Sequence, residues 1–546
     1  MTSRRPVVCQ KFRTMARNMR LALCFCFLFV LVAASVSGFA GTTYYIDCST
    51  GSDNNNGTTK LTPWAHAPGM TGTVKGVGPG TIDIANGSGG MNCGSGSCTL
   101  AGDQFIFKGG ATCGAADFPW TWRESGTSAS PLYIGVDKTW YAGSSWTRPI
   151  LDPGGAAGNL CGNATTAASS STCHPVLQLA PVTYVILDNL EWTDLYWYAS
   201  GTGNSKESYI AMPANATHVE IKNQYMHGWA HHAYSSGANP DVCNLMGGDT
   251  EGLNAGSSFH DNVIDGSDTT KDACVAVWGG PPTIYNNVIR QVSNGAIMDA
   301  ATSFHDNLIE YVNTSYDTTM HMNGFESNAS YTLYVYNNII RHLGSGALGM
   351  WLAPYSGYTV YVFNNLIYDT DVSNSFDVSL PVGNGTCTGD SQGYCPAGQI
   401  KVTNNTFECG PDSNPQGSCG GCPSGASSSR GYAYQGCVFQ NNHFITNNSA
   451  PLANLTYAAM TANNNVAQTQ TAATAQSYTV ASQFSPSQSA PVTVTTQGVN
   501  LGPCSGALLP QCSDLNGTPR PASGNWNIGA YQGEPVPPTH VNTAVQ

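Results

Sequence analysis

The chain has 546 residues and a formal net charge of −13, and only 10% of its residues are charged. Nucleic acid is excluded as an expected partner, because phosphate binding needs many cationic side chains. Hydrophobic residues make up 41% of the chain and aromatic residues 10%, which argues against an intrinsically disordered protein.

Residues 1–40 are predicted to be a signal peptide. They hold six Lys and Arg residues and no acid, followed by an apolar run from Leu21 to Val32 and a cleavage position after Ala40. The run is shorter than the roughly 20 residues that span a bilayer, so we expect cleavage and no stable membrane insertion. The secreted chain would keep 14 basic and 33 acidic residues, a net charge of −19.

Residues 41–180 are predicted to form an N-terminal cap and the first coils of a solenoid. A strand-like segment, Thr43-Tyr-Tyr-Ile-Asp, precedes Gly51-Ser-Asp-Asn-Asn-Asn-Gly-Thr and Thr62-Pro-Trp. The acidic and amide side chains from Asp53 to Asn56 are the oxygen ligands that a calcium loop uses. They also suit a turn in which Asx side chains cap the backbone, which we favour because the acids are few.

Residues 181–450 repeat one short phrase nine times, for example Ile284-Tyr-Asn-Asn-Val-Ile and Phe304-His-Asp-Asn-Leu-Ile. Each phrase is too short for a helix and alternates like a strand on both sides of its amides. The second amide positions are spaced by 20 to 40 residues, as expected for coils that carry loops of varying size. They are Asn189, Gln224, Asn262, Asn287, Asn307, Asn338, Asn365, Asn405 and Asn442.

These repeats predict an all-β, single-stranded parallel β-helix. Asn tolerates the left-handed backbone of a sharp corner, and stacked coils would bring the second amides into a hydrogen-bonded ladder. Side chains that point inward then fill the core. Function must therefore come from outward side chains of one sheet or from loops at the corners.

Residues 451–546 are predicted to hold the last coils and a C-terminal cap. They contain Phe484-Ser-Pro-Ser-Gln-Ser-Ala-Pro, Asp514-Leu-Asn-Gly-Thr-Pro-Arg-Pro and Trp526-Asn-Ile-Gly-Ala-Tyr. With the opening motifs, these segments resemble the caps of secreted pectate-lyase-like right-handed parallel β-helix proteins. The resemblance implies a right-handed helix with an N-terminal and a C-terminal cap. It implies no particular activity, because the same fold serves lyases, hydrolases, esterases and adhesins.

Sixteen cysteines follow residue 40, an even number that predicts disulfides in an exported protein. Short spacings suggest the pairs Cys93–Cys98, Cys161–Cys173, Cys387–Cys395 and Cys504–Cys512, and Cys243–Cys274 would join neighbouring coils. The group Cys409, Cys419, Cys422 and Cys437 allows three pairings. It also permits a zinc site, which export makes less favourable, or a redox motif, which no strand–helix context supports.

The strands upstream of the amide phrases predict a substrate groove. Inward positions assigned from apolar residues such as Met298 and Met350 leave one outward stripe of acids, a histidine and indoles. We expect Asp299, His321 and Glu326 to be catalytic, with Glu326 in an insert after its strand. The expected substrate-binding residues are Trp278, Asn323, Trp351 and Asp377. Indoles for sugar faces and carboxylates for hydroxyls are what a sugar-binding cleft needs. Solvated strand residues without a shared role would give the same pattern.

Two chemistries fit this stripe. A glycosidase needs two carboxyl groups about 5–9.5 Å apart, which favours Asp299 with Glu326 over the pair Asp299 and Asp377. A polyuronate lyase needs a base, here His321 or Lys271, and a cation that neutralises the substrate carboxylate. Calcium would then be held by Asp265, Asp268 and Asp272. We therefore expect a protein that binds polysaccharide and cleaves it as a lyase or a glycosidase. A non-catalytic surface adhesin or spacer is the alternative.

Overall fold

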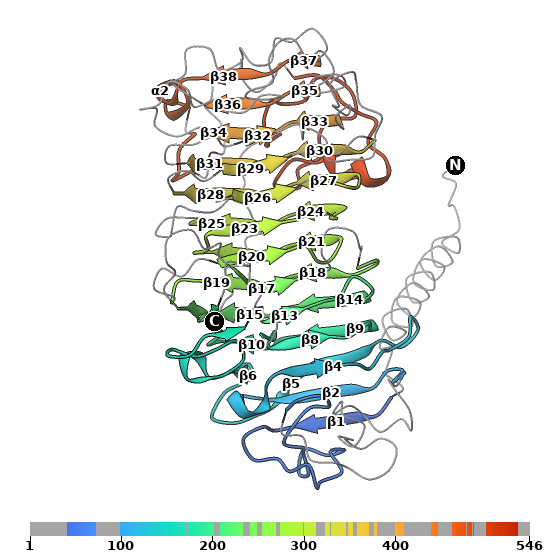
Figure 1. Cartoon of the computed structure of the whole chain (residues 1–546). Helices are drawn as coiled ribbons and strands as arrows, with labels where there is room; N and C mark the ends of the chain where they lie inside the picture. Colours follow the sequence, from blue (N-terminus) through green and yellow to red (C-terminus); the bar gives the residue numbers. More distant parts are fainter. Residues whose placement is uncertain are drawn as a thin grey trace, which may run out of the picture.

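The protein is a parallel β-helix, seen in the computed structural model as coils stacked along one axis (Figure 1). All strand pairings in the three long sheets are parallel, so the expected all-β solenoid is confirmed. The structure describes residues 41–71, 99–169, 173–200, 208–232, 241–247, 254–268, 274–298, 300–312, 323–327, 329–344, 348–352, 357–370, 376–378, 399–408, 438–445, 461–476, 478–482, 484 and 498–532. The predicted signal peptide lies outside them.

Three long sheets form the walls. The thirteen-stranded sheet consists of β1 (Thr43–Ile46), β2 (Gln104–Gly109), β5 (Leu132–Tyr141), β9 (Thr183–Asp188), β14 (Thr217–Lys222), β18 (Ser258–His260), β21 (Thr283–Tyr285), β24 (Ser303–His305), β27 (Leu333–Tyr336), β30 (Thr359–Phe363), β33 (Gln399–Thr403), β35 (Val438–Gln440) and β37 (Thr461–Asn463). The twelve-stranded sheet consists of β3 (Thr112–Cys113), β6 (Ile150–Leu151), β10 (Glu191–Trp192), β15 (Tyr225–His227), β19 (Val263–Asp265), β22 (Val288–Arg290), β25 (Leu308–Glu310), β28 (Ile339–Leu343), β31 (Leu366–Thr370), β34 (Thr406–Glu408), β36 (His443–Ile445) and β38 (Val466–Gln468).

The nine-stranded sheet consists of β4 (Trp120–Trp122), β8 (Leu177–Leu179), β13 (Ile210–Ala211), β17 (Asp241–Met246), β20 (Cys274–Trp278), β23 (Asn294–Ile297), β26 (Asn323–Ser327), β29 (Leu348–Leu352) and β32 (Phe376–Val378). Two small parallel pairs, β7 (Ala168–Ser169) with β12 (Ala199–Ser200) and β11 (Tyr196–Trp197) with β16 (Ala230–His231), extend the early coils. The described helices are short: α2 (Gln470–Thr474) and the 3-10 turns η1 (Ala115–Asp117), η2 (Gly155–Ala157) and η4 (Gly506–Cys512).

The corner between the thirteen- and twelve-stranded sheets is built from the repeated phrase. The first acid or amide of each phrase, from Asn223 to Asn441, has a positive φ of 55° to 58°, which Asn and Asp tolerate better than most residues. The second amide points into the corner and donates to the amide oxygen of the next coil at 2.9–3.1 Å, from Asn262 through to Asn465. The predicted ladder of Asn287, Asn307, Asn338 and Asn365 is confirmed.

Two details of the repeat differ from the sequence prediction. Asn189 is in register with Asn223, because Asp188 pairs with Lys222, and it takes the positive-φ corner position. Its assignment as a second amide is therefore wrong, and Leu190 lies at the ladder position of that coil. At the other end, Asn464 and Asn465 form a tenth corner that the phrase search missed.

The two ends of the solenoid are closed by different devices. At the N-terminal end, the ring of Tyr44 stacks between Trp64 and Phe105 at centroid distances of 4.8 and 5.2 Å. At the C-terminal end, residues 498–532 run back over the first-amide corner, and we call them the C-terminal strap. Asn364, Asn404 and Asn441 each donate a side-chain hydrogen bond to a strap carbonyl, at 2.7–3.0 Å.

Arg520 holds the strap in place. Its guanidinium is 5% exposed and donates to Asn364 Oδ1 at 2.9 Å and to Gln532 Oε1 at 3.1 Å. Gln532 also accepts from the backbone N–H of Asn527 at 2.8 Å. The strap is thus held by hydrogen bonds to one buried cation, Arg520, and to the buried carboxylate of Asp514, which accepts from the backbone N–H of Gln532 at 2.7 Å.

Three disulfides are described. Cys161–Cys173 and Cys504–Cys512 confirm two predicted pairs, and Cys48–Cys113 joins residues that the prediction had left without partners. The other predicted pairs, Cys93–Cys98, Cys387–Cys395 and Cys243–Cys274, and the group Cys409, Cys419, Cys422 and Cys437 lie outside the described side chains. In the described part of the chain, no helix is long and apolar enough to cross a membrane.

Candidate functional site

The nine-stranded sheet carries a column of chemically distinct side chains on its outer face. Inward residues Val277, Ala296, Phe325 and Met350 are in register and fully buried in the core. The residue that follows each of them forms a second column that runs along the helix axis. It comprises Trp278, Ile297, Glu326 and Trp351, and the backbone of Asp377 continues the same register line. Four of the seven predicted catalytic and substrate-binding residues therefore share one register line.

A column of glycines lies next to this line. A Cβ at Gly295 would lie 2.2 Å from Gly324 O, and one at Gly324 would lie 2.8 Å from Cγ2 of the buried Ile340. Gly324 and Phe325 therefore both face the interior. This break in alternation brings Asn323 and Glu326 to the same face, where Asn323 Nδ2 donates to Glu326 Oε2 at 2.8 Å.

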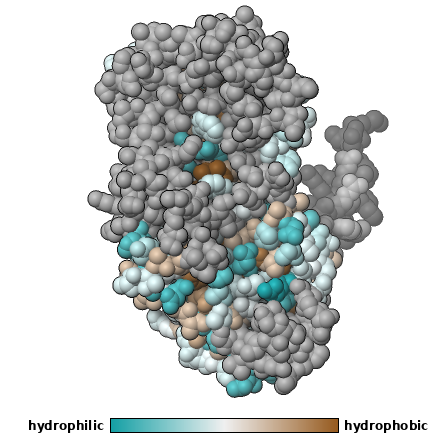
Figure 2. Space-filling view, viewed as in Figure 1, coloured by the Kyte–Doolittle hydropathy of each residue, from teal (hydrophilic) through white to brown (hydrophobic). Residues whose placement is uncertain are grey.

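The exposure of the column is uneven. Trp278 and Trp351 are partly exposed, whereas Asn323 and Glu326 are only 4% and 5% exposed. Glu326 lies within β26 and not in an insert after it, so that expectation is wrong. Figure 2 looks onto this face and shows, at the level of β23 and β26, a small hydrophobic area beside hydrophilic atoms. The column thus combines a sheltered carboxylate with two accessible indoles.

Strand spacing sets the distances along the column. Neighbouring parallel strands are about 4.8 Å apart, so Glu326 lies one step from Trp351 and two steps, about 10 Å, from Asp377 in backbone position. Trp278 and Trp351 are three steps, about 14 Å, apart. A chain of two to three sugar rings spans this length.

Asp299, His321 and Asp272 lie outside the described residues, as does the side chain of Asp377. The chain immediately before Asp299 is described, and Met298 N donates to Glu326 O at 2.9 Å. The backbone that leads to Asp299 therefore runs beside Glu326. The pairing of Asp299 with Glu326 stays a prediction.

The two described acids of the predicted calcium site each contact a cationic side chain. Asp265 binds Arg290 NH2 at 2.5 Å, and this ion pair holds the pKa of Asp265 below its usual value against the opposing effect of burial. Asp268 binds His227 Nδ1 at 2.6 Å, while His227 Nε2 contacts Glu191 at 3.2 Å. Asp272 lies outside the described residues, so calcium binding by these three acids stays a prediction.

His227 illustrates how strongly these acids are engaged. Burial alone would lower its pKa, but the hydrogen bonds to Asp268 and Glu191 raise the pKa of His227 to about 9. The imidazole is therefore cationic at neutral pH and serves as a counter-ion.

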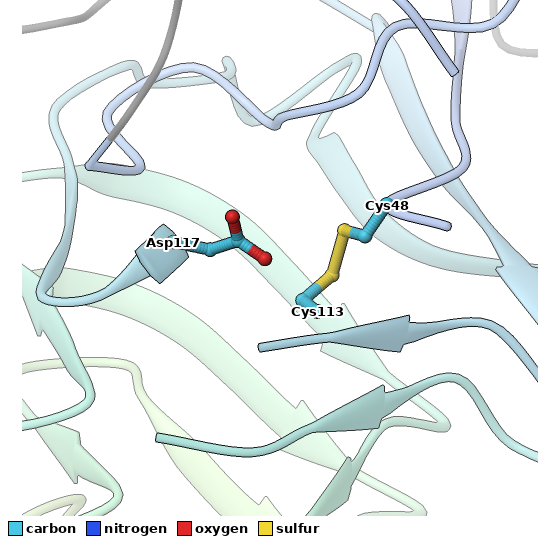
Figure 3. A group of neighbouring side chains, drawn as sticks. All are labelled: Cys48, Cys113 and Asp117. Carbon is cyan, nitrogen blue, oxygen red and sulfur yellow. A yellow bond between two sulfur atoms is a disulfide. The ribbon is translucent and has the colours of Figure 1, made fainter. Parts of the chain in front are cut away.

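One further group has the spacing of metal ligands. Among the described residues, Cys48, Cys113 and Asp117 are the only three His, Cys, Asp or Glu side chains close enough to share an ion. Figure 3 shows that the two sulfurs are joined in a disulfide beside the carboxylate. Disulfide sulfur is not a thiolate ligand, and Asp117 instead contacts His66 at 3.1 Å.

A separate cavity of about 240 Å³ opens on the twelve-stranded sheet beside α2. Its polar walls are Asp369, Glu408 and Gln470, and its apolar walls include Tyr478 and Phe484. Glu408 accepts from Gln470 Nε2 and from Asp369 N, each at 2.6 Å. Sequence reasoning missed this cavity because its walls come from segments far apart in the chain.

Comparison with known proteins shows similarity of fold. No family model and no curated protein matches the chain. Among solved structures, a GH136 lacto-N-biosidase from Eubacterium ramulus is 11% identical over 78% of this chain and 68% of its own, with a TM-score of 0.42. A rhamnogalacturonan lyase is 13% identical over 78% and 87%, with a TM-score of 0.41. Pectate lyase Pel9A is 13% identical over 90% and 96%, with a TM-score of 0.38.

Proposed function

We propose that this protein binds a polysaccharide along the outer column of the nine-stranded sheet and cleaves it there. The observation that carries the proposal is the register line of Trp278, Glu326, Trp351 and Asp377. Indole faces stack on sugar rings, and carboxylates bind hydroxyls or transfer protons. The three described disulfides support action in an oxidising, extracellular setting.

Glu326 is the residue that we assign to proton transfer. It is sheltered, and the hydrogen bond from Asn323 fixes its orientation. In a hydrolase, a second carboxylate would act across the sugar, and Asp299 and Asp377 are the two candidates. Asp377 is about two strand spacings away, which is near the upper limit for the carboxyl pair of an inverting glycosidase.

Trp351 is assigned to substrate binding. It is the register neighbour of Glu326, so a ring stacked on its indole would place the adjoining glycosidic bond beside the carboxylate. Trp278, on the other side of Glu326, would contact the glycan two to three sugar rings away from Trp351. This division predicts that loss of Glu326 lowers kcat, whereas loss of Trp351 raises KM.

The test is a screen of soluble glycans, with and without calcium, read by new reducing ends and by absorbance of unsaturated uronates. Glu326→Gln should abolish cleavage of any substrate found while binding is retained. Trp351→Ala should weaken binding by about tenfold. Glu191→Gln and Trp146→Ala are matched controls, because they change an acid and a partly exposed indole on other surfaces.

The outcome also decides between the chemistries. Reducing ends without unsaturated products identify a hydrolase, and unsaturated products identify a lyase with His321 or Lys271 as the candidate base. If no glycan is cleaved but binding depends on Trp351, the protein is a binding module. If Glu326→Gln and Trp351→Ala leave both activities intact, the column is not the site.

A further inference from the structure

The outer face of the thirteen-stranded sheet changes from small residues to tyrosines at one point along the helix axis. This surface is separate from the outer column of the nine-stranded sheet, which we call the groove below. Inward residues Phe259, Ile284, Phe304, Val335 and Val362 are all fully buried, so the residues on either side of each point outward. One outward line in strict register consists of Ser258, Thr283, Ser303, Tyr334 and Tyr361. This line changes from three small hydroxyl residues to two tyrosines between β24 and β27.

The two tyrosines of this line stack on each other, and a lysine covers the second ring. Tyr334 and Tyr361 lie 5.0 Å apart with their rings 7° from parallel. The far face of Tyr361 is covered by Lys401, whose Nζ is 5.1 Å from the ring centre. One face of Tyr334 is therefore used by Tyr361, and its other face looks along the helix axis over Ser303, which has no ring to cover it.

A wall of rings runs beside this line. The outward residues two positions later form a stack of five rings at centroid distances of 4.5–5.1 Å, with interplanar angles of 7° or less. They are His260, Tyr285, His305, Tyr336 and Phe363. Residues two apart on a strand are about 7 Å apart. The small residues thus form the floor of a shelf, with ring edges along one side and the face of Tyr334 at one end.

We propose that this shelf, defined by Ser258, Thr283, Ser303 and Tyr334, binds one pyranose ring of a neutral glycan. A sugar stacked on Tyr334 would continue the 5.0 Å repeat of the stack, with its apolar face on the phenol and its hydroxyls over Ser303 and Thr283. All four residues are partly exposed, as a site for an external ring requires.

The charges around the shelf decide the kind of sugar. His305 is paired with Asp306 at 2.7 Å, and His260 is paired with Asp261 at 2.6 Å. Glu220, at the far end of the line, binds Lys222 at 2.7 Å. Asp261, Asp306 and Glu220 thus place three carboxylates around the shelf, and the chain as a whole carries −13. An acidic sugar is repelled by these carboxylates, and the cations along this line, Lys222 and Lys401, already contact Glu220 and the Tyr361 ring, so a neutral sugar is the complementary ligand.

The shelf is tested by titration with xylohexaose, mannohexaose, cellohexaose and laminarihexaose, with hexagalacturonate as the acidic counter-probe. The readouts are calorimetry and saturation-transfer NMR. Wild type should bind at least one neutral hexasaccharide more tightly than hexagalacturonate. Tyr334→Ala should weaken that binding about tenfold, and Tyr334→Phe should retain it, because stacking and not the hydroxyl carries the affinity.

Ser303→Tyr is the second, independent variant. It should extend the ring stack over the face of Tyr334 that no described ring covers, and abolish binding without loss of folding. Tyr311→Ala is the matched control, because Tyr311 is a partly exposed tyrosine that stacks on His342 away from the shelf. The proposal is overturned if no neutral hexasaccharide binds, or if Tyr334→Ala and Ser303→Tyr bind as wild type does.

The proposals for the shelf and for the groove can be refuted independently of each other. Binding that survives Trp351→Ala but is lost in Ser303→Tyr belongs to the shelf. Binding that survives Ser303→Tyr but is lost in Trp351→Ala belongs to the groove and contradicts the shelf. The shelf titrations need no cleavage, so an inactive groove does not affect them.

Discussion

Removing one rung of the amide ladder should destabilise the protein measurably. Asn338 is fully buried. Its Nδ2 donates to Asn365 Oδ1 at 2.9 Å and to Phe304 O at 3.0 Å. Its Oδ1 accepts from both the backbone N–H and the side chain of Asn307, each at 3.1 Å. Asn338→Ala would delete all four bonds at once.

The free energy of unfolding lost in Asn338→Ala depends on which of the former partners keep another hydrogen bond. Asn365 Oδ1 still accepts from Asn338 N at 3.0 Å, and Asn307 Nδ2 still donates to Ile284 O at 3.2 Å. The backbone N–H of Asn307 loses its acceptor inside the corner. One buried unpaired donor costs about 1–3 kcal/mol, and the groups that keep another partner lose little beyond it. We therefore expect a loss of about 1–3 kcal/mol.

Equilibrium denaturation in urea measures this loss as a change in midpoint at constant slope. Asn215→Ala, at an exposed turn residue, is the control and should change stability by less than about 0.5 kcal/mol. A loss for Asn338→Ala no larger than that of the control would refute the view that the ladder supports the corner.

Three further predictions follow from the ends and the cysteines. Thiol titration of the exported protein, denatured without reductant, should find essentially none of its 16 mature cysteines free, and two or more free thiols would contradict it. Hydrogen bonds to Asp117 and Asp53 raise the pKa of His66 from 6.5 to about 9. The stability that protonated His66 contributes is therefore complete below pH 6.5 and is lost as pH rises through about 9. His66→Gln should flatten that part of the pH–stability curve, and an unchanged slope would count against the assignment. Arg520→Ala should expose residues 498–532 to limited proteolysis before the coils are cut, whereas an unchanged cleavage pattern would show that the strap is held by other contacts.

The corner was the most predictable part of the fold. In each phrase the first amide adopts a positive φ and the second forms the hydrogen bond of the ladder. Both requirements fall on adjacent residues, so the sequence pattern shows them directly. Asn189 was misassigned because Leu190 replaces the second amide in that coil, leaving one amide to fill two possible positions. The bond Cys48–Cys113 was missed because 65 residues separate its partners.

The site was less predictable because strict alternation fails at Gly324, where two consecutive positions face inward. Glu326 was expected in a loop because the alternation of Met320 and Met322 placed the strand before Asn323. Another feature was available but unused: the third residue after each second amide gives Asp265, Arg290, Glu310 and Arg341 in successive coils. In the structure these residues form ion pairs along the twelve-stranded sheet.

The uniform rungs of the ladder also bear on how such a protein changes over evolutionary time. Asn287 and Asn307 are separated by 20 residues, and Asn365 and Asn405 by 40, yet both rungs measure 3.0 Å. The hydrogen-bond geometry of the amide corner therefore does not depend on how many residues are inserted elsewhere in a coil. Loops around the outward column can lengthen, shorten or be exchanged without disturbing the stack. The outward column can in this way diverge faster than the scaffold that carries it.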